Sequence, residues 1–416
     1  MTVFGLIWIA IILYCLIKKD IKYTLFATLL FMTFQSSNVL IINGTGIGPG
    51  VLTAIIFVMK IFISQRFVIR NIKLEKRVFL LAILLPTVAI ISLAQNQILG
   101  ETMMLLLQLI VYVVCFISIQ FIKQDISTDD IYAMIRTLIV FHVIFTIIEF
   151  LTTVHMLPLR PVLDVLVYND PSTDIVFHKE YYSRVMSTFM EPSYFAGFLV
   201  GAFYFLLNQK EEWYKNRFLF IAIIIEILLT KSSTAYGACL IVGMVFVITS
   251  KSFNFKQKII LCGISIMGYL ILYFGFYSLL DAVIFSKDTT GSFSTRERFD
   301  NTAIDAYKSS PIFGVGYKNC RGSSIVYSLL GQMGIAGLSV YAVFNVCVCC
   351  KSKLSKTISN LDRNMLKSAK FGVMAVVACQ IISCPDLDLC TYWMWLFIYS
   401  IMLLGLRSNR RSNRNL

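Results

Sequence analysis

Three of the arginines in the two longest polar stretches of this otherwise mostly apolar chain are candidates for binding an anion. Arg184 is near the end of the first stretch, and Arg296 and Arg298 form a close pair in the second. A guanidinium binds a phosphate group through two parallel hydrogen bonds, whereas a lysine acts as a point charge. The pattern therefore predicts a site for an anion such as a diphosphate. The alternative is that the close pair are surface cations matched to Glu297 and Asp300.

A carboxylate stands directly before an expected helix start. Glu191 is followed by Pro192, and proline is favoured at the first position of a helix. The unpaired N–H groups of that first turn would face the same interface. At this place Glu191 suits a general base that takes a proton from a sugar hydroxyl. The alternative is that Glu191 only complements the helix dipole.

Two further groups of polar residues are candidates for chemistry. The turn TKSST, at 230–234, offers Lys231 and four hydroxyls to a sugar or a phosphate, or serves only to satisfy helix ends. Ionisable residues inside apolar runs are costly in lipid, which makes them functional candidates. They are Lys60, Arg136, His142 and Glu149, although the first two are long enough to extend to the membrane interface.

The second polar stretch should contain its own helix. Ser294 and Glu297 form a capping-box pattern, which predicts a helix start with both arginines in its first turn. Pro311 disfavours helical geometry at the residue before it, so the helix should end near Ser309.

Glycines dominate the residues that follow this helix. In the segment PIFGVGYKN, Gly314 and Gly316 allow a tight turn and a close backbone approach. Gly331, Gly334 and Gly337 then allow a neighbouring helix to approach the next span closely. We interpret the second set as packing rather than chemistry.

The composition identifies the class of protein that carries these residues. Of the 416 residues, 57% are hydrophobic and only 14% are charged, and the mean hydropathy is +0.76. A water-soluble domain carries about 25% charged residues, so this chain cannot cover a water-facing surface. We predict an all-α, polytopic transmembrane bundle in a single membrane domain, 1–416, with about thirteen spans. The expected spans are 2–17, 23–42, 47–64, 78–94, 102–122, 131–151, 190–208, 217–230, 234–249, 258–280, 325–350, 370–384 and 391–406.

The loops between these spans alternate in charge. Most of the 37 lysines and arginines fall on one side, which the positive-inside rule makes cytoplasmic. The N-terminus is then outside, and the basic tail at 407–416 is in the cytoplasm. The long polar stretches, 152–189 and 281–324, become extracytoplasmic loops. The net charge of +14 is thus largely topological, which argues against a nucleic-acid partner.

Cysteine and histidine usage gives no sign of a metal site. Most of the eleven cysteines lie inside apolar runs, and only three histidines are present. No group has the spacing of zinc ligands, and no carboxylate cluster is evident. We therefore expect neither a metal nor a cofactor. The first apolar run also lacks the basic start and small-residue end of a signal peptide.

Two motifs resemble the O-antigen polymerase and ligase superfamily. One is RVMSTFMEPSYFA, from Arg184 to Ala196, and the other runs from Arg298 through PIFGVGYKN to Gly337. The resemblance implies joining of undecaprenyl-diphosphate-linked oligosaccharides at the outer face of a bacterial inner membrane. It also implies a flippase and a chain-length regulator as partners.

The resemblance assigns roles to the candidate residues. Glu191 would be the catalytic base. The diphosphate would be held by Arg184, Arg296, Arg298 and Lys231, and Tyr317 would contact sugar. Ligases of the superfamily typically carry a histidine just after the GxG segment, where residues 320–324 here read CRGSS. This difference favours polymerase over ligase.

Two other classes of protein remain open from the sequence. A lipid-linked oligosaccharide flippase would be expected to have short loops on both faces and related halves, and the two long cationic loops argue against it. An ion-coupled solute transporter would require a broken helix pair lined by Lys60, Arg136 or Glu149.

Overall fold

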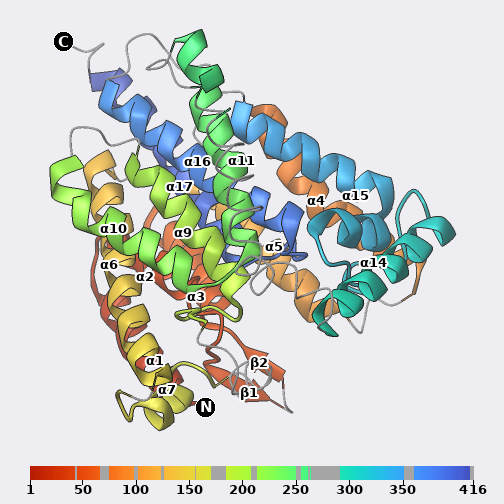
Figure 1. Ribbon diagram of the computed structural model, residues 1–416, viewed down its shortest axis with the longest axis horizontal. Helices are drawn as coiled ribbons and strands as arrows, with labels where there is room; N and C mark the ends of the chain where they lie inside the picture. The colour runs from red at the N-terminus through yellow and green to blue at the C-terminus, as the bar shows by residue number, and fades with distance from the viewer. Residues whose placement is uncertain are drawn as a thin grey trace.

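The computed structural model describes most of the chain (Figure 1). The described residues are 1–42, 45–65, 75–97, 102–122, 126–154, 156–169, 184–207, 213–249, 254–260, 263, 291–350 and 360–412. Most of them are helical. The helices are α1 (Val3–Ile17), α2 (Ile21–Phe31), α3 (Pro49–Gln65), α4 (Lys76–Gln95), α5 (Met103–Ser118), η1 (Ile119–Phe121), α6 (Thr128–Thr153), α7 (Arg160–Leu166), α9 (Pro192–Leu207), α10 (Trp213–Leu229), α11 (Ser233–Thr249), α14 (Gly291–Ser309), α15 (Ile325–Cys350), α16 (Asn360–Ile382) and α17 (Cys390–Ser412). A short hairpin, β1 (Leu40–Ile42) with β2 (Thr45–Ile47), is antiparallel.

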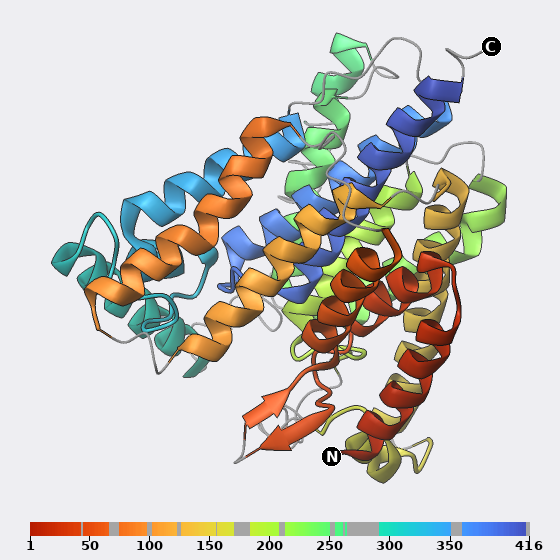
Figure 2. The ribbon, with the colours of Figure 1, turned by 180° about the vertical axis from the view of Figure 1, so that it is seen from behind.

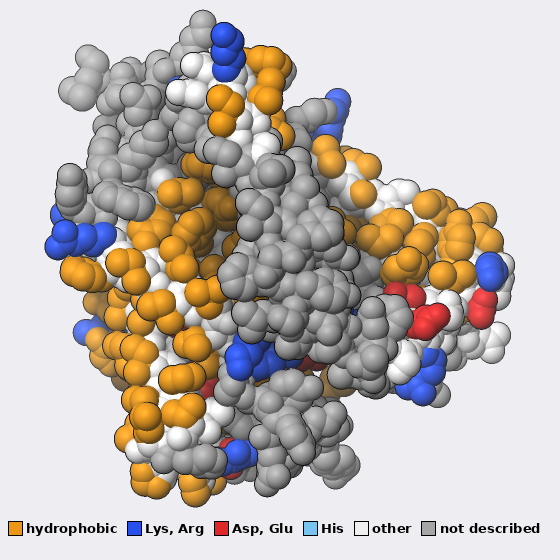
Figure 3. All heavy atoms as spheres, viewed as in Figure 1, with side chains coloured by type: hydrophobic (Ala, Val, Ile, Leu, Met, Phe, Trp, Pro, Cys, Tyr) orange, Lys and Arg blue, Asp and Glu red, His pale blue; other side chains and the backbone are white. Residues whose placement is uncertain are grey.

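The all-α, multi-pass membrane architecture predicted from composition is confirmed. In the described part of the chain, five helices are long and apolar enough to cross a membrane, and they include α4, α6 and α15. Large apolar side chains point outward along the bundle, for example Leu6, Leu80 and Phe218. Figure 3 shows hydrophobic side chains over much of the described surface of one face. Such a surface suits lipid rather than water.

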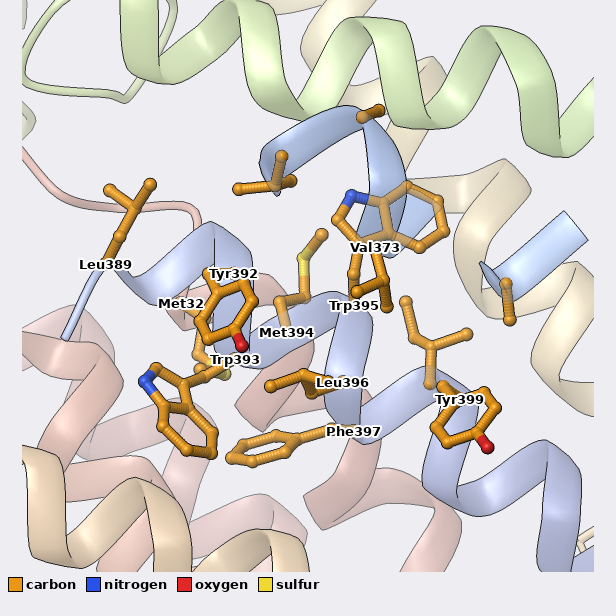
Figure 4. Close-up of a cluster of buried hydrophobic side chains, with 14 of the residues drawn as sticks. Met32, Val373, Leu389, Tyr392, Trp393, Met394, Trp395, Leu396, Phe397 and Tyr399 are labelled. Atoms are coloured by element: carbon orange, nitrogen blue, oxygen red, sulfur yellow. The ribbon is translucent and has the colours of Figure 1, made fainter. Parts of the chain in front are cut away.

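Helix α17 lies at the centre of the bundle between α5 and α9. Figure 4 shows Trp393 and Phe397 on one side of α17 and Trp395 on the other. The ring of Trp393 packs on Tyr112 of α5, and that of Trp395 packs on Phe205 of α9. A Cβ at Gly201 of α9 would lie 2.7 Å from the Trp395 ring, and one at Gly372 of α16 would lie 2.1 Å from it. Only glycine leaves room for this indole.

The predicted span at 23–42 is wrong in its second half. Helix α2 ends at Phe31, and the chain then turns and enters β1. The reason is the run of polar residues that follows, because each finds a partner outside the helix. The Thr188 hydroxyl donates to the Thr33 carbonyl at 2.8 Å, the Ser36 hydroxyl donates to the Phe189 carbonyl at 2.6 Å, and the Ser37 hydroxyl donates to the Val167 carbonyl at 2.7 Å.

Contacts between segments that are distant in sequence lie at two ends of the bundle. At one end, Lys22 forms an ion pair with Asp130 at 2.7 Å. At the other end, the Thr2 hydroxyl donates to the Asn38 carbonyl at 2.6 Å, and the Gln35 amide donates to the Thr391 hydroxyl. The N-terminus and the end of α17 lie at opposite ends of the molecule (Figure 2). The predicted span at 258–280 lies mostly outside the described residues.

Candidate functional site

Helix α15 is broken beside the loop that leads to the candidate site. Gly334 has φ 62°, a left-handed geometry that interrupts the helix. The segment after α14 fills the break, because Val315 N–H donates to the Gly331 carbonyl and Ile335 N–H donates to the Pro311 carbonyl, both at 2.9 Å. The backbone groups freed by the break are therefore satisfied by this loop.

The glycines predicted to permit close packing do so, and their partner is this loop together with α14. A Cβ at Gly314, which has φ 70°, would lie 2.3 Å from the backbone of Gln332. A Cβ at Gly334 would lie 2.4 Å from the carbonyl group of Ile312, and one at Gly331 would lie 3.0 Å from the Ala303 carbonyl oxygen. The PIFGVG segment is thus a structural insert that fixes the residues after it.

The first of those residues is a lysine held between two carboxylates. The Lys318 ammonium lies 2.6 Å from Asp386 and 2.7 Å from Asp388, both in the loop between α16 and α17. Burial opposes the charge of Lys318, but the two carboxylates outweigh it and raise the lysine pKa above its ordinary value. Burial also opposes the charge of Asp386, yet Lys318 lowers its pKa to about 2. The pKa of Asp388 is raised, chiefly by burial.

The start of α9 joins the same cluster. The Tyr194 hydroxyl donates to Asp386 at 2.5 Å, and the Cys384 thiol contacts the Ser193 carbonyl. Pro192 is the first helical residue, as predicted, and Glu191 precedes it half-buried. The Ser193 hydroxyl donates to the Glu191 carboxylate at 3.0 Å. Three segments that are far apart in sequence therefore meet here.

Arg321 completes the cluster. The residue is exposed. Burial opposes its charge, but the acidic groups of the cluster, among them Asp386 and Glu191, raise the pKa of Arg321 above its ordinary value. The sequence analysis did not single out this arginine.

Side chains of α6 bind the segment that leads to Glu191. The Glu149 carboxylate accepts from Ser187 N–H at 2.7 Å and from Met186 N–H at 3.0 Å. His142 Nδ1 lies 2.9 Å from the Ser187 hydroxyl, and Ser187 has φ 53°. These two buried residues, predicted as functional candidates inside a span, thus position the backbone before the site.

Arg184 lies at the turn between α10 and α11. Its Nε donates to the Thr230 carbonyl at 3.0 Å, and Val185 N–H donates to the Leu229 carbonyl. Lys231 is exposed in the same turn, with φ 45°. The structure brings these two predicted anion-binding residues to one place.

Arg296 and Arg298 lie on a different part of the molecule. Helix α14 begins at Gly291 rather than Ser294, because the first turn tolerates residues whose N–H groups have no intrahelical partner. Both arginines therefore follow the first turn, and the predicted helix start at Ser294 is wrong. Arg298 is exposed over the Phe299 ring. Figure 1 shows α14 at one edge, apart from the turn between α10 and α11.

Other candidates take structural places. The Tyr317 side chain is fully buried, so it presents no face to a sugar in this structure. The Lys60 ammonium donates to the carbonyls of Cys15 and Lys18, both at 2.7 Å, at the end of α1. Arg136 is exposed. Two of the three histidines, His155 and His178, lie outside the described part of the chain, as do Tyr181 and Tyr182.

The sequence reading missed the loop between α16 and α17. Its signal was present, because CPDLDLC places two acids in a short connection between apolar runs. Its partner Lys318 lies 68 residues earlier, so no local pattern links them. Arg321 was noted only as part of a segment that lacks histidine.

Comparison with known families gives a match to one part of the chain. Residues 218–338 match the family described as O-antigen ligase. The match covers the turn that holds Lys231, helix α14, the glycine loop, Lys318 and Arg321; Arg184 and Glu191 precede it, and Asp386 follows it. It supports the O-antigen polymerase and ligase superfamily and a glycosyltransferase-like activity of that type. A search of curated proteins finds no match.

Proposed function

From the O-antigen ligase match, we propose that this chain polymerises undecaprenyl-diphosphate-linked oligosaccharide repeats at the outer face of a bacterial inner membrane. In this reaction a sugar hydroxyl of one lipid-linked chain attacks the anomeric carbon of another. A new glycosidic C–O bond forms, and the C–O bond to the diphosphate breaks. The hydroxyl proton passes to a base, and undecaprenyl diphosphate leaves with the bonding electron pair.

The observation that carries this proposal is the place of Glu191. It is the half-buried carboxylate at the start of α9, where segments from three parts of the bundle meet. Asp386 and Asp388 share that location, but both form ion pairs with Lys318. Among the described residues, the Glu191 carboxylate accepts a hydrogen bond from the Ser193 hydroxyl alone, so it is the acid of this cluster best placed to take a proton.

The arginines and Lys231 supply cationic sites for the substrates. Polymerisation joins two lipid-linked chains, and each carries a diphosphate. Two separate cationic groups match this requirement: Arg184 with Lys231 at the turn between α10 and α11, and Arg296 with Arg298 on α14. We propose that both groups hold diphosphates.

Polymerase is preferred over ligase because of the residues after the glycine loop. Cys320 and Ser323 occupy the stretch where a ligase histidine is expected. Ser323 is bound to the Asp300 carboxylate at 2.7 Å and 2.8 Å. The only histidine in the described part of the chain, His142, is fully buried in the bundle and bonded to Ser187. The base must then come from elsewhere, and Glu191 meets that need.

The test is chain lengthening by purified protein in liposomes with undecaprenyl-diphosphate-linked repeats. Wild-type protein should produce a ladder of longer lipid-linked products. Glu191→Gln keeps the shape and should reduce the rate by roughly 10²–10⁴-fold, as expected for loss of a general base. Glu297→Gln, a change at an exposed carboxylate on α14, is the matched control. Normal lengthening by Glu191→Gln would leave Glu191 only a structural role.

The same preparation separates the rival functions. A flippase would move the lipid-linked repeat across the bilayer without lengthening it. A ligase would transfer the glycan only when a lipid core acceptor is added. Either result with wild-type protein would overturn the polymerase proposal.

A further inference from the structure

The polar connection between α2 and β1, residues 32–39, binds the segment that leads to Glu191. The Ser36 hydroxyl donates to the Phe189 carbonyl at 2.6 Å. Ser36 N–H also donates to the carbonyl of the preceding residue, Thr188, at 3.1 Å. All three residues are fully buried, so water cannot readily replace these bonds. Ser36 thus binds two consecutive carbonyls, and the second lies two residues before Glu191.

The same connection makes two further bonds to this segment and one to α17. Gln35 N–H donates to the Thr188 carbonyl at 2.9 Å, and the Thr188 hydroxyl donates to the Thr33 carbonyl at 2.8 Å. The Gln35 side chain extends the link, because its amide donates to the Thr391 hydroxyl at 2.9 Å. The connection therefore fixes the backbone before Glu191 relative to the first turn of α17.

Other elements bind the earlier part of the segment. Glu149 of α6 accepts from the N–H groups of residues 186 and 187, as described above. The Tyr168 hydroxyl, which follows α7, donates to the Ser187 carbonyl at 2.7 Å. Among the described contacts with other parts of the chain, the Ser36 bond is the nearest to Glu191 on its N-terminal side.

The place of the Glu191 carboxylate depends on the backbone that carries it. In the described part of the chain, its side chain is bound only by Ser193 of its own turn. On the C-terminal side the backbone is fixed by α9, where Phe195 N–H donates to the Glu191 carbonyl at 3.1 Å. On the N-terminal side the Ser36 bond has this role. A general base must lie within hydrogen-bond reach of the proton that it takes, so such supporting contacts affect the rate.

We propose that Ser36 is a positioning residue for Glu191. Its hydroxyl, bonded to the Phe189 carbonyl, sets the place of the base against the attacking sugar hydroxyl. Ser36 takes no part in the proton transfer, in which the hydroxyl proton passes to Glu191 as the new C–O bond forms. The inference rests on the proposed polymerase function, and it gives a role in catalysis to a connection outside the family match at 218–338.

The alternative is that Ser36 only stabilises the fold, and the next residue offers a matched control. Ser37 is also fully buried, and its hydroxyl also donates to a carbonyl, that of Val167 at 2.7 Å. Val167 follows α7 and is not part of the segment that leads to Glu191. Ser37→Ala therefore removes a bond of the same kind from the same connection without releasing that segment.

The experiment measures chain lengthening by the two alanine variants in liposomes with undecaprenyl-diphosphate-linked repeats. Ser36→Ala should lower kcat by roughly 10–10²-fold with KM little changed, because a shift of about 1 Å at a reacting group can cost 10²-fold. Ser37→Ala should leave kcat near that of wild type. The melting temperatures of the two variants should decrease by similar amounts, since each loses one buried hydrogen bond.

A double-mutant cycle with Glu191→Gln tests whether Ser36 acts through the base. If it does, Ser36→Ala should have little further effect on kcat once the carboxylate is absent. A residue that only stabilises the fold would lower the rate by the same factor in both backgrounds. Thr188→Val releases the same segment by removing the bond to Thr33, and it should lower kcat in the same way. It takes the place of Ser36→Ala in the cycle if that variant does not fold.

Three results would overturn the positioning role and leave the polymerase proposal standing. They are a normal kcat for Ser36→Ala and Thr188→Val, an equal loss of kcat for Ser36→Ala and Ser37→Ala, and an unchanged factor in the Glu191→Gln background. Absence of lengthening by wild-type protein would instead remove the proposed function itself.

Discussion

At the scale of single residues, Lys318 forms the central ion pairs of the candidate site. Its ammonium lies between Asp386 and Asp388 and forms an ion pair with each of them. A cation held in this way stabilises the loop between α16 and α17 against the glycine loop. In the proposed function, Glu191 is then the acid of this cluster that is not paired with Lys318.

Removal of the lysine charge should destabilise the protein. Lys318→Met leaves two poorly solvated carboxylates without a cation, and we expect a loss of about 3 kcal/mol in the free energy of unfolding. Lys308→Met removes an exposed pair with Asp305 and should cost about 0–1 kcal/mol. Thermal unfolding in detergent measures both. Equal effects of the two changes would contradict a supporting role for Lys318.

Lowering the pH should weaken the ion pair between Lys318 and Asp386. Its pKa is about 2 in the folded protein, below the ordinary value of 3.8, so its ionised form contributes stability above about pH 4. That contribution is lost as the pH falls toward 2. The raised pKa of Asp388 acts in the opposite sense and offsets part of the loss. Between pH 5 and pH 2, the melting temperature should therefore decrease more steeply for wild type than for Asp386→Asn.

The sequence was informative at this scale only where chemistry is local. Glu191 before Pro192 was identified because a helix start is read from adjacent residues. The pairing of Lys318 with Asp386 was not, because it is made by folding across 68 residues. Tyr317 was assigned to sugar, but its burial depends on the packing of the glycine loop, which no local pattern shows.

At the scale of elements, the break in α15 decides where the site can form. The helix is interrupted at Gly334, and the loop at 311–316 enters the gap and bonds to both sides of it. The sequence predicted close packing at these glycines, and the structure confirms it. That the partner is a loop rather than a span follows from the left-handed geometry of Gly334, which spacing alone does not reveal.

Filling this gap should be damaging. Gly334→Ala places a methyl group 2.4 Å from the Ile312 carbonyl and forces alanine into a left-handed conformation, and we expect a loss of about 2–4 kcal/mol. Gly197→Ala in α9 is the control, since its nearest neighbour would be Val376 at 3.5 Å, an ordinary contact. Unfolding measurements that show the two changes to be equivalent would disprove the argument.

At the scale of the whole molecule, the contacts separate two ends. Lys22 and Asp130 meet at one end, and Thr2, Asn38 and Thr391 lie among the contacts of the other. Composition and charge predict which loops share a side of the membrane, because span length and loop charge are one-dimensional properties, and that assignment stays a prediction. The early end of α2 was not predicted, because it depends on contacts with the segment at 184–190.

The orientation of these ends in the membrane is testable. In spheroplasts treated with protease, we expect a tag after residue 416 to be protected and a tag before Met1 to be digested. The physical reason is the basic tail at 407–416, which the positive-inside rule retains in the cytoplasm. Digestion of the C-terminal tag with protection of the N-terminal one would invert the proposed topology.

The packing of Trp395 against α9 and α16 has a consequence for the biogenesis of the protein. Helix α17 packs between α5 and α9, and both of those helices are synthesised before it. Asp386 is likewise synthesised 68 residues after Lys318. Until that late stretch leaves the ribosome, the lysine has no counter-ion and the slot for the indole is open. A nascent chain that stalls before residue 386 therefore displays both defects to the quality-control proteases of the membrane.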